Sequence, residues 1–69
     1  MIYKTTITAD TTANEDVTSE VEIHIEENQI VDLMFSSDSL DSDDKLFFAW
    51  EAMDELGICA ENSPSEFIS

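Results

Sequence analysis

The feature that most constrains the fold is a strict alternation of apolar and polar residues between Thr18 and Glu27. The apolar positions are Val21, Ile23 and Ile25, and the polar positions between them are Glu20, Glu22, His24 and Glu26. Successive side chains of a β-strand point to opposite faces. The segment therefore predicts a strand with one face in a core and the other face charged.

Two further segments predict strands. Residues 2–9, IYKTTITA, are rich in β-branched side chains. Residues 30–35, IVDLMF, follow the alternating strand of residues 18–27 after the short turn ENQ, in which Asn28 tolerates a left-handed conformation. A turn this tight predicts antiparallel pairing. We expect Val31, Leu33 and Phe35 to face the core, with Ile30, Asp32 and Met34 on the other face.

A helix is predicted from Ser42 to Leu56. Asp41 or Ser42 suits the N-cap, and the two acids that follow suit the positive end of the helix dipole. Gly57, the only glycine, marks the end of the helix. We therefore expect an α+β fold (βββα), a three-stranded antiparallel sheet with one helix packed on one face. Its 69 residues form a single domain, in which residues 59–69 either pack back onto the core or fray.

A helical wheel at 3.6 residues per turn divides this helix into two faces. The expected core stripe consists of Leu46, Ala49, Trp50, Met53 and Leu56. The acids opposite to it are Asp43, Asp44, Glu51, Asp54 and Glu55. Phe48 falls at the border, where it can reach the core, whereas Phe47 falls among the acids. Three alternatives stay open for Phe47: packing under the tail, exposure as an anchor for a partner, or self-association.

The charge of the chain decides between classes of partner. There are 17 acidic residues, two lysines and no arginine, which give a net charge of −15. DNA, RNA and anionic membranes would repel such a chain, whereas a basic protein surface would attract it. An acidic surface without a partner and an adaptation to high salt are the alternatives that the composition leaves open.

Catalytic and metal-binding patterns are not expected. One histidine, one cysteine and one glycine leave no nucleophile beside a base and no phosphate-binding loop. The acids around Asp41 do not form a calcium loop, because Leu46 stands where glycine is needed. We therefore expect no enzyme, no cofactor and no metal. The lone Cys59 and the lack of a long apolar run predict a cytoplasmic protein with no membrane contact.

The acidic residues suggest two candidate binding faces. Glu20, Glu22 and Glu26 point the same way at about 6.7 Å per two residues, which is similar to the phosphate spacing of a nucleic-acid strand. Asp32 on the neighbouring strand would widen this row. The helix offers the second face, which is expected to lie on the opposite side of the protein. The candidate partner-binding residues are Glu20, Glu22, Glu26, Asp32, Asp43, Asp44, Phe47, Glu51, Asp54 and Glu55.

In size, charge and architecture, the chain resembles the small acidic anti-CRISPR proteins of phages and mobile elements. The likeness rests on the strand SEVEIHIEE, the helix segment DSDDKLFFAWEAMDE and the near-absence of basic residues. The resemblance implies a nucleic-acid mimic that occupies the basic site of a CRISPR effector subunit in the host bacterial cytoplasm.

The sequence thus predicts a non-enzymatic inhibitor, a monomer rather than a homodimer, which binds a basic nucleic-acid-binding protein. The alternative is a small structural or assembly subunit that docks through Phe47 and the C-terminal tail.

Overall fold

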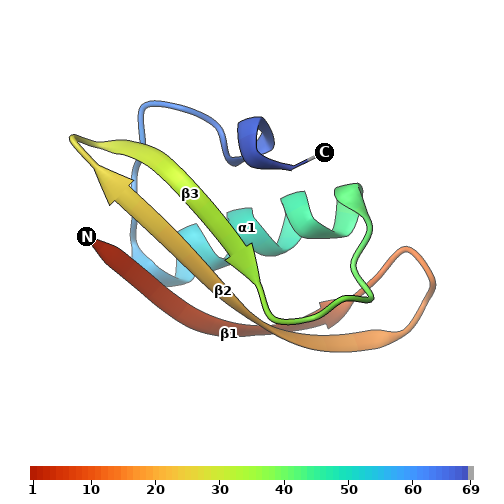
Figure 1. Ribbon diagram of the computed structural model, residues 1–69. Helices are drawn as coiled ribbons and strands as arrows, with labels where there is room; N and C mark the ends of the chain where they lie inside the picture. Colours follow the sequence, from red (N-terminus) through yellow and green to blue (C-terminus); the bar gives the residue numbers. More distant parts are fainter. Residues whose placement is uncertain (69) are drawn as a thin grey trace.

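The computed structural model describes residues 1–68 and confirms the expected α+β fold. The elements are β1 (Ile2–Asp10), β2 (Asp16–Glu26), β3 (Gln29–Phe35), α1 (Ser42–Leu56) and a short 3-10 helix, η1 (Pro64–Phe67). The strands form one antiparallel sheet in the order β1-β2-β3, and α1 crosses one of its faces (Figure 1). No helix of residues 1–68 is long and apolar enough to span a membrane.

The turn between β2 and β3 is tight and Asn28 is left-handed, as expected, but the turn consists of two residues and Gln29 already belongs to β3. Glu26 pairs with Gln29, and the two residues between them, Glu27 and Asn28, have φ angles of 53° and 64°. Two consecutive residues with positive φ are the signature of a type I′ hairpin, whose twist matches that of the flanking strands.

A β-bulge in β3 corrects one expectation about the core. His24 pairs with Asp32 and Ile25 pairs with Ile30, so Val31 is an extra residue without a partner position. An extra residue reverses the alternation of side chains on one side of the bulge. Ile30 is therefore buried, at 2% exposed, and Val31 is 48% exposed. The prediction that Val31 faces the core and Ile30 faces away is wrong, whereas Leu33 is buried as expected.

The core lies between α1 and the sheet. Its buried apolar side chains are Ile7, Val21, Ile23, Ile30, Leu33, Leu40, Phe48, Ala49, Ala52 and Met53. Phe48 is the largest of them and is fully buried, and the two small alanines let the helix backbone approach the strands.

The helix is rotated about its axis relative to the face predicted from the wheel. Ala49 and Met53 are buried as expected, but Trp50 is 49% exposed, so its assignment to the core is wrong. Two acids explain the rotation, because they accept hydrogen bonds from the β1–β2 hairpin. Asp44 bonds to Thr12, and Glu55 accepts from the Thr5 hydroxyl at 3.0 Å. Both acids lie on the same side of α1 as Phe48. Their bonds to the hairpin therefore turn this side of the helix, and Phe48 with it, toward the sheet.

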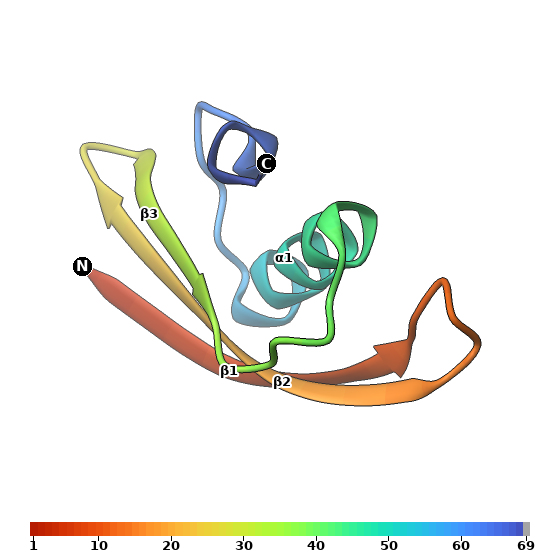
Figure 2. The ribbon, with the colours of Figure 1, turned by 45° about the vertical axis from the view of Figure 1, so that its right-hand side comes forward.

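The C-terminal tail packs against the body of the protein. The side-chain amide of Asn62 accepts a hydrogen bond from the Ile30 amide at 2.7 Å and donates one to the Ile30 carbonyl at 2.9 Å. Pro64 is buried, and η1 lies beside β3 and α1 (Figure 2). The tail up to residue 68 is therefore held against the body of the protein at Asn62, Pro64 and η1.

Candidate partner-binding surfaces

Most of the acidic side chains are exposed. Of the 17 acids, all except the half-buried Glu22 and the buried Asp44 are exposed. In residues 1–68, the basic side chains within ion-pair distance of a carboxylate are those of Lys4 and of His24, and His24 carries a charge only when it is protonated. The surface therefore keeps most of its negative charge without an internal counter-charge.

The predicted row of glutamates lies on the sheet face that is turned away from α1, which we call the open sheet face. Glu20, Glu22 and Glu26 alternate with core residues of β2, and Asp32 lies opposite His24 across the β2–β3 pair. The four acids are thus brought to one face, as the alternation predicted. Asp32 also accepts a hydrogen bond from the Leu33 amide at 2.8 Å.

Two of these glutamates already have partners. The Lys4 ammonium lies 3.0 Å from the Glu20 carboxylate, and the hydrogen bond and charge of Glu20 raise the pKa of Lys4. The Glu22 carboxylate lies 2.6 Å from Nε2 of His24. The open sheet face is therefore less free to bind a cation than its count of acids suggests.

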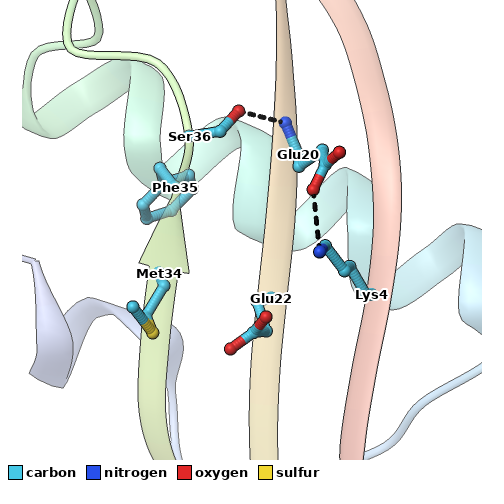
Figure 3. Close-up of a pocket in the computed structure, with 6 residues that line it drawn as sticks. All are labelled: Lys4, Glu20, Glu22, Met34, Phe35 and Ser36. Atoms are coloured by element: carbon cyan, nitrogen blue, oxygen red, sulfur yellow. Dashed lines mark hydrogen bonds and ion pairs between the residues drawn. The ribbon is translucent and has the colours of Figure 1, made fainter.

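A shallow hollow is present on the open sheet face. Its lining residues are Lys4, Glu20, Glu22, Met34, Phe35 and Ser36. Figure 3 shows the Lys4–Glu20 ion pair across its rim and the Glu20 amide donating to the Ser36 hydroxyl, at 2.9 Å. Met34 beside it is 51% exposed.

The acids at the start of α1 hold the structure together. Asp41 is the N-cap, and its carboxylate accepts hydrogen bonds from the Asp44 amide at 2.9 Å and from the Thr12 hydroxyl at 3.0 Å. Both hydrogen bonds lower the pKa of Asp41, the bond from the Asp44 amide more than the bond from the Thr12 hydroxyl. Asp44 accepts from the Thr12 amide at 3.0 Å and from the Thr12 hydroxyl at 3.3 Å.

Asp44 is therefore a tether between α1 and the β1–β2 hairpin. It is only 6% exposed, so its predicted place among the outward-facing acids is wrong. Glu55 stays exposed, although it accepts the hydrogen bond from Thr5.

The outward side of α1 combines acids with aromatic rings. We call this side the aromatic–acidic face, and it consists of Asp43, Phe47, Trp50, Glu51 and Asp54. Phe47 and Trp50 are each 49% exposed, and the three acids are exposed as predicted. Of the alternatives for Phe47, burial under the tail is thus excluded. Its ring lies edge-on to that of Phe48, with centroids 6.4 Å apart and an interplanar angle of 69°.

Trp50 is the surface residue that sequence reasoning missed. The helix carries more large apolar residues than one stripe can bury, and Ala49 and Ala52 were the available signal. Small residues mark the side of a helix that approaches a sheet closely, and Trp50 lies almost opposite Ala52 on the helical wheel, which leaves it on the outer side.

Metal-binding chemistry has no assembled site in the part of the chain that is described. No group of three or more His, Cys, Asp or Glu side chains in residues 1–68 is arranged to hold a metal ion. Cys59 is exposed and has a free thiol.

Comparisons with known proteins returned no match: no family model, no curated protein and no solved structure is similar to this chain.

Proposed function

We propose that the protein is a non-enzymatic inhibitor that binds a basic, nucleic-acid-binding surface of another protein by charge mimicry. The observation that carries the proposal is that nearly all of the 17 acids are exposed, and that few of those in residues 1–68 form an ion pair with a basic side chain. A CRISPR effector complex is the proposed target, by the resemblance to small acidic anti-CRISPR proteins. The protein would act as a monomer in the bacterial cytoplasm.

The physical basis of the proposal is electrostatic. A surface of this charge repels nucleic acid and is attracted to the same basic grooves that bind it. Complementary charge speeds association and makes it sensitive to salt. The net charge of −15 also exceeds the magnitude of about 2–8 that keeps a small domain soluble. Solubility alone therefore does not account for the excess.

The test is capture of a target from a bacterial lysate, followed by competition with DNA. We expect the captured protein to release its DNA when this chain binds, and we expect binding to weaken as NaCl rises. A captured protein that keeps its DNA would contradict mimicry, and so would an affinity that is unchanged between low and high salt.

Charge reversal then separates the two acidic faces. One variant carries Glu20→Lys, Glu22→Lys and Glu26→Lys on the open sheet face. The other variant carries Glu51→Lys, Asp54→Lys and Glu55→Lys on α1. If neither variant binds the target more weakly than the wild type, the acids do not carry the interaction.

A second candidate function is that of an assembly subunit that docks through Phe47 and the tail. The 49% exposure of Phe47 favours it. In that case Phe47→Ala should weaken assembly more than either charge-reversed variant does. Size-exclusion chromatography tests the related possibility of a homodimer that covers the acids, which would contradict mimicry.

A further inference from the structure

We propose that the aromatic–acidic face of α1 is the contact surface for the target, and that it receives an arginine-rich segment of that protein. The proposal rests on the proposed function and adds to it the face, the anchoring residues and the side chain that they recognise.

The spacing of the five residues makes them one continuous surface. Phe47 and Trp50 are three residues apart, and Asp43 and Glu51 each lie four residues from Phe47. Asp54 lies four residues beyond Trp50. Helix positions three or four residues apart are neighbours, with about 5–6 Å between their Cβ atoms. Phe47 and Trp50 therefore project from neighbouring positions of α1, with an acidic residue at each end and a third beside them.

The aromatic–acidic face differs from the rest of the surface because two aromatic residues one helical turn apart, Phe47 and Trp50, are both exposed on it. The other large apolar residues that are exposed in residues 1–68 are Met1, Ile2, Val31, Met34 and Phe67. Of these five, only Phe67 is aromatic, so Phe47 and Trp50 are the pair of large aromatic residues that is exposed on one helix in residues 1–68. Aromatic side chains inside a polar rim are the usual composition of an interface hot spot.

The chemistry of the face favours arginine over other basic side chains. A guanidinium group stacks on an aromatic ring and is attracted by its negative face. The same planar group donates two parallel hydrogen bonds to a carboxylate. Trp50 beside Asp54, and Phe47 beside Glu51, each offer both elements. A lysine ammonium offers the charge without the planar, bidentate geometry.

The open sheet face fits such a partner less well. Lys4 and His24 already occupy the carboxylates of Glu20 and Glu22. A cationic side chain of the partner would have to displace these contacts, and Lys4 would repel it. On the aromatic–acidic face, by contrast, no cation of residues 1–68 lies within ion-pair distance of Asp43, Glu51 or Asp54.

The probe for the test is a synthetic helical peptide of leucine, alanine and arginine, labelled with fluorescein. Binding to the full chain is measured by fluorescence anisotropy at low and moderate NaCl. Trp50 is the only tryptophan, so its emission reports directly on this face. We expect the peptide to shift the Trp50 emission to shorter wavelength and to protect it from quenching by acrylamide.

Two alanine variants and one matched control locate the site. We expect Phe47→Ala and Trp50→Ala each to weaken binding by about 30-fold, the effect of losing a hot-spot residue. Met34→Ala is the control, because Met34 is 51% exposed and Phe47 is 49% exposed, but Met34 lies on the open sheet face. We expect it to leave the affinity unchanged within about twofold.

Further variants keep the test valid if the loss of the Phe47–Phe48 contact destabilises the fold, which circular dichroism would reveal. The double variant Glu51→Gln, Asp54→Asn removes only the acids and should also weaken binding. Replacing arginine by lysine in the peptide should weaken it by roughly 2- to 5-fold, the range of a cation–π contact at an exposed site. Equal affinity for the two peptides would overturn the preference for arginine.

The outcomes distinguish this inference from the proposed function. If the peptide binds in a salt-dependent way, but only Glu20→Lys and Glu22→Lys weaken it, the aromatic–acidic face is the wrong site and the electrostatic function stands. If the peptide does not bind even at low salt, both proposals fail.

Discussion

Removing the carboxylate of Asp44 should destabilise the protein far more than removing that of its neighbour Asp43. Asp44 is the one buried acid among residues 1–68, and it accepts two hydrogen bonds from Thr12, at 3.0 and 3.3 Å. These bonds join the start of α1 to the β1–β2 hairpin, 32 residues away in the chain. Asp44→Ala therefore removes a tether between two parts of the fold.

The magnitude follows from the charge of the acceptor. A hydrogen bond to an ionised group contributes about 1.5–3 kcal/mol. This range is for a single bond. Of the two bonds to Asp44, the one from the Thr12 hydroxyl is shared with Asp41, and Thr12 is exposed, so water replaces part of the lost bonding and the total loss stays within the range for one bond. We expect the free energy of unfolding to fall by about 2 kcal/mol. A domain of this size has roughly 3–10 kcal/mol in total, and the melting temperature should fall by about 8–16 °C.

The assay is urea unfolding followed by the Trp50 fluorescence, with Asp43→Ala as the matched control. Both variants lose one negative charge from the same turn of α1, so both relieve the self-repulsion of the chain equally. Asp43 is exposed and contributes mainly through the helix dipole, about 0.3–1 kcal/mol. If the two variants unfold at the same urea concentration, the Thr12 bonds do not stabilise the fold and the argument is wrong.

Three further predictions concern pH, the tail and salt. The hydrogen bond and charge of Asp16 raise the pKa of Asp10 from 3.8. The folded chain thus binds this proton more tightly than the unfolded chain, so the contribution of Asp10 to stability should rise as pH falls from above its raised pKa toward 3.8. Asp16→Asn should abolish this rise, and an NMR titration in which the Asp10 pKa stays raised would contradict the cause. Asn62→Ala should destabilise the protein by about 1–2 kcal/mol and speed hydrogen exchange of the Ile30 amide, because both of its bonds to Ile30 are lost. The comparison is Ser65→Ala, at an exposed position of η1, which should leave that amide protected. Added NaCl should raise the melting temperature by screening the net charge of −15, and a flat or falling trend would show that the charges are already compensated.

The local elements were predictable because their signals lie within each segment. The observed helix, Ser42–Leu56, has the predicted bounds, with Asp41 as N-cap. Gly57 ends it with a φ of 69°, and the Ile58 amide donates to the Met53 carbonyl at 2.9 Å. Caps and periodicity involve residues only a few positions apart, so no knowledge of the rest of the fold is needed.

The candidate site was predictable only in part. The sequence identified the acids and singled out Phe47, but it assigned Trp50 to the core and Asp44 to the surface. A helical wheel shows which residues share a face and leaves open how that face is turned toward the sheet. Hydrogen bonds from Thr12 to Asp44 and from Thr5 to Glu55 fix the rotation of α1 about its axis, and these pairs are 32 and 50 residues apart.

By itself, the sequence determined the three strands, the helix with its caps, the tight turn between β2 and β3 and the large negative charge. Each depends on hydrogen bonding, periodicity or composition within a short segment. The tertiary structure decided the rotation of α1, the bulge that buries Ile30, the burial of Asp44 and the docking of the tail through Asn62. These features depend on contacts between distant segments, and those contacts exist only once the helix and the tail have packed against the sheet.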